Sequence, residues 1–314
     1  MAIVQTDVPM TSQLCEQTIG QLLRRYPAFT SESLTTTAFG RPVLTLQIGN
    51  GERRVIYSAA HHANEWITTP VLLKFLEELA RAQEEDGSVF GVPARNILKA
   101  ATIYAVPMVN PDGVDLVTGA IQTGTLEYET ARLLADNYPD IPFPEGWKAN
   151  LLGVDLNLQY PAGWLRAREI KFSQGFTKPG PRDYVGRAPL SQRESIALAQ
   201  YTRDVNPALV IALHTQGEVI YWQFGDYVVP GARALAEEFS RLSGYGLEDT
   251  PYASSFAGYK DWFIQNWRRP GFTIESGLGE SPLPLSQFDE IYQANLGILV
   301  TGATGLPGQT KNNG

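Results

Sequence analysis

Four side chains that can bind or activate a metal ion follow segments of the sequence that are typical of β-strands. His62 and Glu65 come just after one such segment. His214 directly follows a second segment, and Glu275 is the last residue of a third. Because the carboxyl ends of strands in open α/β sheets face the ligand crevice, we expect these side chains to meet there. Two histidines and one carboxylate are a common ligand set of catalytic Zn²⁺, with a fourth position left for water.

A catalytic zinc site also needs a free carboxylate as general base for the zinc-bound water, and Glu275 occupies a suitable place. The residues alone leave alternatives. A single histidine at a strand end is more often structural, and Glu65 could serve as an acid that complements a helix dipole. His61 competes with His62, because it too could pair with Glu65. All three histidines of the chain fall at strand ends, which favours a metal site over these alternatives.

The elements that must position these residues alternate between helix and strand along the chain. Helical periodicity or capping signals predict helices at 12–25, from Thr69-Pro70 to Leu79, at 127–134, from the capping box Ser191-x-x-Glu194 to Arg203, and at 231–242, 258–267 and 286–300. Apolar runs predict strands at 43–48, 54–60, 101–109, 208–213 and 271–275.

Three stretches between these elements carry turn or loop signals. Gly49-Asn50-Gly51 predicts a tight hairpin that joins strands 43–48 and 54–60, and Asn110-Pro-Asp-Gly113 predicts a turn. Residues 164–190, rich in Gly, Pro and Arg, are expected to form long loops. No linker or change of composition divides the chain. The sequence therefore predicts one α/β domain over 1–314, with short flexible termini at about 1–8 and 306–314.

Composition excludes several classes of function. The 314 residues include 33 acidic and 25 basic ones, a net charge of −8, which argues against nucleic acid or an anionic membrane as the main partner. The single cysteine, Cys15, excludes an intramolecular disulfide and a cysteine-based zinc site. No signal peptide or membrane span is visible, so we expect a cytoplasmic location. The sequence also lacks a Gly-x-Ser-x-Gly elbow, a P-loop and a dinucleotide fingerprint.

The motif His62-Ala-Asn-Glu65-Trp-Ile67 is followed in order along the chain by five further motifs: Asn110-Pro-Asp-Gly113, Gly153-Val-Asp155-Leu-Asn157, His214 after an apolar strand, Asp261-Trp262 and Phe272-Thr-Ile-Glu275. Together they resemble the motifs of the zinc metallocarboxypeptidases, the carboxypeptidase A family. The resemblance implies a mixed eight-stranded twisted sheet flanked by helices. It also implies one Zn²⁺ ion per chain, held by His62, Glu65 and His214 rather than by His61.

The same resemblance implies roles for further residues. Glu275 would be the general base, and Asp155 would orient the first histidine. Asn157 is implied as a substrate-binding residue. Lys148 matches the position of an arginine that polarises the scissile carbonyl, and a lysine can still supply positive charge there. The alternative is that Lys148 is a solvated surface residue.

Three departures or ambiguities bear on specificity. Leu158 stands where the family usually has an arginine that clamps a free C-terminal carboxylate, which puts ordinary carboxypeptidase activity in doubt. Lys260 falls in the pocket that selects the residue after the scissile bond, where a cation would favour an extra carboxylate; alternatively it lies on an exposed helix face. For the mobile catalytic tyrosine of the family, Tyr252 is our choice and Tyr259 the rival.

Motifs around Trp147-Lys-Ala-Asn150, His214-Thr-Gln-Gly217 and Tyr259-Lys-Asp-Trp262 resemble one branch, the γ-D-glutamyl-L-diamino acid endopeptidases. That resemblance implies cleavage of the γ-D-glutamyl–meso-diaminopimelate bond in peptidoglycan stem peptides or muropeptides. The D-glutamate carboxylate would then bind one of the arginines of the loop-rich middle: Arg166, Arg168, Arg182 or Arg187. Alternatives are a zinc carboxypeptidase, a small-molecule amidohydrolase of the same fold, and a catalytically silent protein that binds wall peptides.

Overall fold

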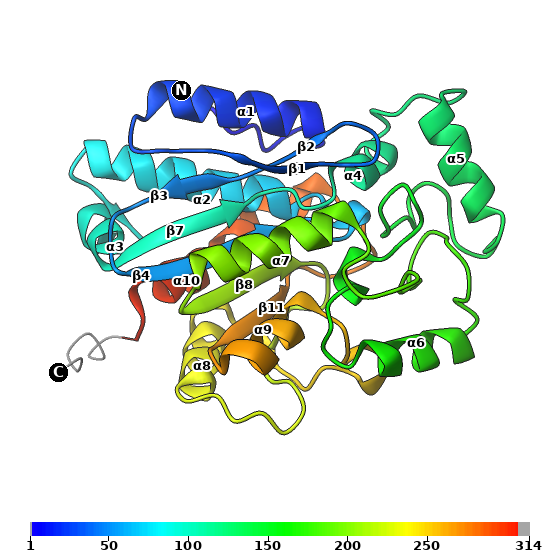
Figure 1. Cartoon of the computed structure of the whole chain (residues 1–314). Helices are drawn as coiled ribbons and strands as arrows, with labels where there is room; N and C mark the ends of the chain where they lie inside the picture. The colour runs from blue at the N-terminus through cyan, green and yellow to red at the C-terminus, as the bar shows by residue number, and fades with distance from the viewer. Residues whose placement is uncertain (1, 307–314) are drawn as a thin grey trace.

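A twisted sheet of mixed strand direction runs through the middle of the protein and carries the candidate site at one edge. The computed structural model describes residues 2–306 (Figure 1). Within that range the strand order is β10-β9-β11-β8-β4-β7-β3. The strands are β3 (Leu46–Ile48), β4 (Arg53–Ala59), β7 (Ala101–Val106), β8 (Leu209–His214), β9 (Val219–Tyr221), β10 (Gly246–Leu247) and β11 (Gly271–Glu275). The pairs β7·β4, β4·β8, β8·β11 and β9·β10 are parallel, and β3 and β9 pair antiparallel with β7 and β11.

Helices cover both faces of this sheet (Figure 1). One apolar layer contains residues of α1 (Ser12–Arg25), α2 (Thr68–Glu84), α3 (Ala94–Ala100), α8 (Ala232–Ser243) and α10 (Phe288–Thr304). The opposite layer contains residues of α7 (Arg193–Val205) and α9 (Tyr259–Trp267). The remaining helices are α4 (Pro111–Val117), α5 (Leu126–Ala135) and α6 (Trp164–Ser173), with short 3₁₀ turns η1 (Ala63–Glu65), η2 (Leu156–Leu158), η3 (Tyr252–Ser254) and η4 (Leu285–Gln287).

Strand β8 shows why its sequence is almost entirely apolar. Leu209, Ile211 and Leu213 belong to the layer of α2 and α10. Val210 and Ala212 belong to the layer of α7 and α9. A central strand of this kind is buried on both faces, so apolar side chains are favoured at every position. The run ends at His214, where the chain emerges at the carboxyl edge of the sheet.

The α/β fold and most of the predicted elements are confirmed. The predicted hairpin is wrong, because β7 lies between β3 and β4. Gly49 and Gly51 instead let the chain pass close to the junction of α3 and β7: a Cβ on Gly49 would lie 2.3 Å from the carbonyl oxygen of Ala101. The turn thus crosses the start of β7, which the two glycines permit because they lack a side chain.

Four smaller expectations also need correction. The Asn110 motif begins helix α4, where the Asn110 side chain accepts a hydrogen bond from the Gly113 N–H. Strand β7 accordingly ends at Val106. Residues 164–173 form α6 rather than a loop. Helix α7 begins at Arg193 with no side-chain cap, because Ser191 donates its hydroxyl to Gln159 instead of capping the helix.

The main sheet has seven strands in the described range, whereas the resemblance implied eight. The strand β1 (Ser33–Thr36) pairs with β2 (Pro42–Leu44) in a separate two-stranded sheet. Only Thr45 separates β2 from β3, so the two-stranded sheet of β1 and β2 continues from the edge strand β3 of the main sheet. A second small sheet pairs β5 (Ser88–Val89) with β6 (Val92–Pro93).

At the N-terminus, the backbone N–H groups of Ile3 and Val4 donate to the Glu77 carboxylate. The flexible C-terminal end expected from residue 306 onward lies almost wholly outside the described residues. Between residues 2 and 306, no helix combines the length and the apolar character that crossing a membrane requires.

Candidate active site

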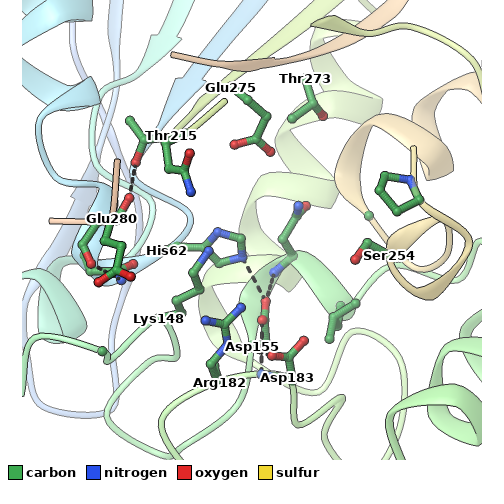
Figure 2. Close-up of a pocket in the computed structure, with 18 of the residues that line it drawn as sticks. His62, Lys148, Asp155, Arg182, Asp183, Thr215, Ser254, Thr273, Glu275 and Glu280 are labelled. Carbon is green, nitrogen blue, oxygen red and sulfur yellow. Dashed lines mark hydrogen bonds and ion pairs between the residues drawn. The ribbon is translucent and has the colours of Figure 1, made fainter. Parts of the chain in front are cut away.

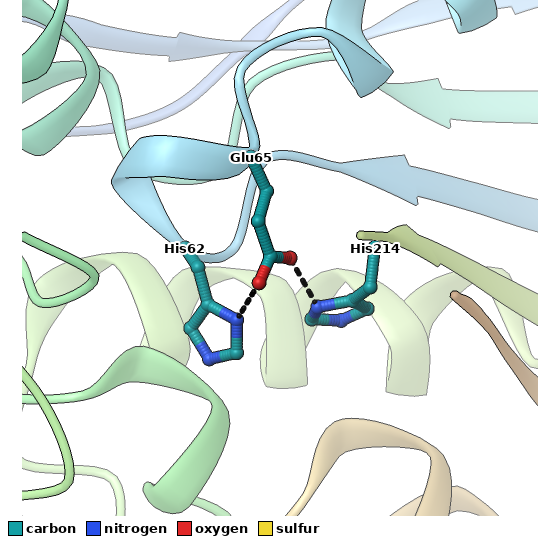
Figure 3. Close-up of side chains that lie close together, drawn as sticks. All are labelled: His62, Glu65 and His214. Carbon is teal, nitrogen blue, oxygen red and sulfur yellow. Dashed lines mark hydrogen bonds and ion pairs between the residues drawn. The ribbon is translucent and has the colours of Figure 1, made fainter. Parts of the chain in front are cut away.

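His62, Glu65 and His214 converge at the carboxyl edge of the sheet (Figure 3). Strands β4 and β8 are parallel neighbours, with Ala59 opposite Leu213, so their ends deliver the two histidines to one place. The Nδ1 atoms of His62 and His214 each lie 2.8 Å from a different oxygen of the Glu65 carboxylate. One ligand atom from each residue falls within 4.8 Å of the others, so the three residues can hold a metal ion.

The electrostatics of this group fit a divalent cation. Burial by itself raises the pKa of Glu65, but His62, Lys148 and His214 outweigh it and hold that pKa well below its usual range. Glu65 is therefore a carboxylate, buried and surrounded by donors, among them the backbone N–H of Thr215 at 3.3 Å. A buried anion beside two imidazoles is the donor set that Zn²⁺ prefers, so the residues present fit the implied metal.

Asp155 fixes the orientation of the His62 ring. Its Oδ1 atom lies 3.2 Å from His62 Nε2 and also accepts a hydrogen bond from the Asn157 N–H at the start of η2. Its Oδ2 atom accepts from the Asp183 N–H. With Nε2 engaged in this way, Nδ1 is the nitrogen that faces Glu65 and is free to bind a metal. This geometry is the one expected of a residue that orients a ligand histidine.

His61 lies behind the site rather than in it. Its ring stacks on that of His214 with centroids 5.4 Å apart and lies 5.7 Å from the ring of Tyr259. Neither ring nitrogen of His61 has a hydrogen-bond partner among the described residues. Burial, followed by the two neighbouring histidines, lowers the pKa of His61 well below its usual value, so the ring is neutral. The competition between His61 and His62 is thus decided by geometry in favour of His62.

A cavity of about 780 Å³ is lined by His62 and by Thr215, the residue after His214 (Figure 2). Eight candidate site residues from the sequence analysis line it: His62, Lys148, Asp155, Asn157, Leu158, Arg182, Lys260 and Glu275. Glu275 ends β11 directly opposite His214 on the parallel strand β8. Burial, reinforced by the Glu65 carboxylate, raises the pKa of Glu275 despite the nearby histidines and Lys148. A raised pKa makes this carboxylate a better proton acceptor, as a general base requires.

Lys148 is not a solvated surface residue. Its Nζ atom lies 3.0 Å from Glu65 Oε1, and its side chain lines the cavity. The segment that carries it is tied to the metal-ligand segment, because the Ala63 N–H donates to the Lys148 carbonyl oxygen. Asn110 strengthens this junction, since its Nδ2 atom lies within hydrogen-bonding distance of the carbonyls of His61, Lys148 and Ala149. The Asn110 motif therefore joins two segments of the site, which its turn-like sequence did not reveal.

Lys260 is buried at the cavity wall, so the alternative of an exposed helix face is wrong. Its Nζ atom lies 2.6 Å from Asp261 Oδ1 and also donates to the carbonyl oxygen of Gln223. Asn157 lines the same cavity, and its Oδ1 atom accepts from the Tyr259 N–H. The positive charge of Lys260 is thus balanced inside the protein, and a role in selecting substrate remains a prediction.

The structure does not bring either candidate tyrosine hydroxyl to the three candidate ligands. Tyr252 is 61% exposed, and its hydroxyl accepts a hydrogen bond from Arg166 outside the cavity. Tyr259 is buried, and its hydroxyl pairs with that of Thr202 at 2.8 Å. Pro251 and Ser254, which flank Tyr252, do line the cavity, so Tyr252 lies at its margin.

Lys171 and Asp183 are among the cavity residues that sequence reasoning did not single out. They come from α6 and from the loop that follows it, and Lys171 Nζ lies 2.6 Å from Asp183 Oδ1. No local signal marks them, because the segment was expected to be a long loop. Only the packing of α6 against the loop at 181–185 places them beside Asp155.

Comparisons with known proteins agree with this geometry. The zinc carboxypeptidase family model matches residues 15–297. The chain is 46% identical over 284 residues to gamma-D-glutamyl-L-diamino acid endopeptidase 1 of Lysinibacillus sphaericus, covering 90% of this chain and 69% of that protein. It is 37% identical to the uncharacterized protein YqgT of Bacillus subtilis (strain 168), covering 90% and 74%. The crystal structure of thrombin activatable fibrinolysis inhibitor superposes with a TM-score of 0.75 at 17% identity, covering 97% and 76%.

Proposed function

The chain belongs to the zinc carboxypeptidase family, and we propose that it hydrolyses the γ-D-glutamyl–meso-diaminopimelate bond of bacterial peptidoglycan stem peptides. The observation that carries this proposal is the 46% identity, over 90% of the chain, to a protein named for γ-D-glutamyl-L-diamino acid endopeptidase activity. The cavity is consistent with such a substrate, because it is large and lined by several charged side chains.

Leu158 supports endopeptidase rather than carboxypeptidase action. The family resemblance places a carboxylate-clamping arginine at this position, whereas Leu158 is part of an apolar group with Trp164, Ala167, Val185 and Ala257. Leucine offers no charge to a free C-terminal carboxylate. The protein therefore does not need a free C-terminal carboxylate at this position, and a peptide that continues beyond the residue after the scissile bond is not at a disadvantage there.

The roles we assign follow from the positions of the side chains. His62, Glu65 and His214 would hold the zinc ion, which when bound supplies a Lewis acid for the scissile carbonyl. Glu275 takes a proton from the attacking water, a step that its raised pKa favours, and then passes the proton to the leaving amine. Lys148 places its ammonium group near the carbonyl oxygen, where negative charge develops. Asp155 keeps Nδ1 of His62 directed at the metal.

Zinc-loaded protein and the peptide L-Ala-γ-D-Glu-meso-diaminopimelate test the proposal. We expect cleavage that releases diaminopimelate, and equal cleavage when the C-terminal carboxyl is amidated. A carboxypeptidase would reject the amidated peptide and trim ordinary peptides from the C-terminus instead. A silent binding protein would show the same null activity as its Glu275→Gln variant. Either result would contradict the proposal.

A further inference from the structure

Two cations in the cavity share one carboxylate. The cavity is lined by four lysine and arginine side chains in the described part of the chain: Lys148, Lys171, Arg182 and Lys260. Lys260 pairs with Asp261, and Lys148 pairs with Glu65, which His62 and His214 also contact. Lys171 and Arg182 instead both contact Asp183, at 2.6 Å and 2.7 Å. Counted by direct ion pairs, the group of Lys171, Asp183 and Arg182 therefore keeps one positive charge unbalanced, and Asp155 and Glu65 are the further carboxylates that act on Arg182.

That unbalanced charge is presented by Arg182. The Lys171 side chain is only 8% exposed, whereas that of Arg182 is 41% exposed and faces the cavity. Arg182 bonds to Asp183 through Nε, and its two terminal nitrogens have no hydrogen-bond partner within residues 2–306. A guanidinium group with a free edge of this kind matches the two oxygens of a carboxylate.

The backbone around Arg182 is fixed against the catalytic residues. The carbonyl oxygen of Pro181 accepts hydrogen bonds from the N–H groups of Lys148 and Ala149, at 2.8 Å and 2.9 Å. On the other side, the Asp183 N–H donates to Asp155. Figure 2 shows the guanidinium of Arg182 below the imidazole of His62, and Glu275 above it. Arg182 is thus held close to Lys148, the side chain that we place at the carbonyl oxygen.

We propose that Arg182 binds the free α-carboxylate of the D-glutamyl residue whose γ-carbonyl is attacked, an inference that rests on the proposed function. A γ-linked glutamyl residue carries this carboxylate a short aliphatic chain away from the scissile carbonyl, and an α-linked peptide has no carboxylate there. An arginine next to Lys148 therefore distinguishes the two linkages. Because the side chain contacts the substrate away from the reacting atoms, Arg182 determines specificity.

The other three arginines considered from the sequence are placed elsewhere. Arg166 bonds to Glu169 and to the Tyr252 hydroxyl on the surface. Arg168 lies over the ring of Phe172. Arg187 is exposed and does not line the cavity. Arg187 follows Arg182 in the same loop, so an Arg187→Gln variant is a matched control.

Two substrates that differ in one group test the role of Arg182: L-Ala-γ-D-Glu-meso-diaminopimelate and its analogue with the glutamyl α-carboxylate converted to a carboxamide. For the zinc-loaded protein we expect kcat/KM to be roughly tenfold to hundredfold lower on the carboxamide, the effect of losing a charged hydrogen bond. Arg182→Gln should lower kcat/KM on the carboxylate substrate by a similar factor and leave the carboxamide almost unaffected. Arg182→Lys should retain part of the preference, and Arg187→Gln all of it.

Several results would overturn the inference. Equal cleavage of both substrates by the unmodified protein would leave the proposed function standing but refute the role of Arg182. The role would also be refuted if Arg182→Gln kept the full preference for the carboxylate substrate. The same holds if Arg182→Gln and Arg182→Lys lowered kcat/KM equally on both substrates. If Arg182→Gln instead removed a preference for a free over an amidated diaminopimelate carboxyl, Arg182 would be assigned to the leaving residue. Cleavage of neither substrate would refute the proposed function itself.

Discussion

Replacing Asp155 with asparagine measures how much the protein gains by orienting His62 for a metal ion. Three donors meet the Asp155 carboxylate: His62 Nε2 at 3.2 Å, the Asn157 N–H at 3.0 Å and the Asp183 N–H at 3.3 Å. The first two contact Oδ1 and the third contacts Oδ2. An asparagine has one acceptor oxygen, so its NH₂ group must face either His62 and Asn157 or Asp183, and cannot accept from them.

The size of the effect follows from these contacts. Even in the better orientation, with the amide oxygen toward His62, two donors oppose each other at Asp183, and the negative charge beside the imidazole is lost. Removing an outer partner of a ligand histidine typically costs tenfold to hundredfold in metal affinity. We therefore expect Asp155→Asn to raise the dissociation constant for Zn²⁺ by that factor, or about 1.4–2.7 kcal/mol.

Equilibrium competition with a zinc chelator measures this change, and circular dichroism of the metal-free protein shows whether the fold is kept. The matched control is Asp86→Asn, because Asp86 pairs with Arg95 on the surface and its side chain is 73% exposed. The control should bind zinc as the unmodified protein does. If Asp155→Asn bound zinc with unchanged affinity while His62→Ala bound it weakly, the orienting role of Asp155 would be refuted.

Three further predictions concern other parts of the molecule. Glu275→Gln should lower kcat by roughly 10²- to 10⁴-fold without changing zinc stoichiometry, and turnover close to that of the unmodified protein would exclude Glu275 as the general base. Burial raises the pKa of Glu194 to about 7, so ionisation in the unfolded chain lowers stability as pH rises from about 4.5 to 7. Glu194→Gln should remove this dependence and stabilise the protein by roughly 2–3 kcal/mol above pH 7, as urea unfolding at several pH values would show; parallel pH curves for the two proteins would contradict it. Gly113→Ala should destabilise the protein by roughly 1–3 kcal/mol, because a Cβ there would lie 2.5 Å from the Ala149 carbonyl oxygen. The control Gly20→Ala, whose Cβ would have 3.5 Å of room on α1, should be neutral or stabilising, and a similar loss in both variants would show that the close contact is not the cause.

Local signals in the sequence were enough to predict elements whose residue types are compatible with only one environment. The apolar run of β8 indicated a strand buried on both faces, and α1, α5, α9 and β11 lie within a residue or two of their expected bounds. Where a signal was compatible with two structures, local reasoning chose wrongly. Gly49-Asn50-Gly51 suits both a hairpin and a close crossing of another segment, and only the insertion of β7 between β3 and β4 decides between them.

For the candidate site too, some features followed from the sequence and others only from the tertiary structure. The sequence by itself indicated the candidate metal ligands, their places at strand ends and, through ordered motifs, the family. The tertiary structure decided which of two adjacent histidines turns toward Glu65. It placed Lys148, which is half-buried, and Lys260, which is buried, at the cavity, and it directs the hydroxyls of Tyr252 and Tyr259 elsewhere. It also brought Asp183 to the side of Asp155 and selected Arg182, among the four arginines considered from the sequence, as the one that lines the cavity. The physical reason is that a residue type and its spacing fix the chemistry a side chain can offer, whereas its direction, partners and net charge depend on segments far away in the chain.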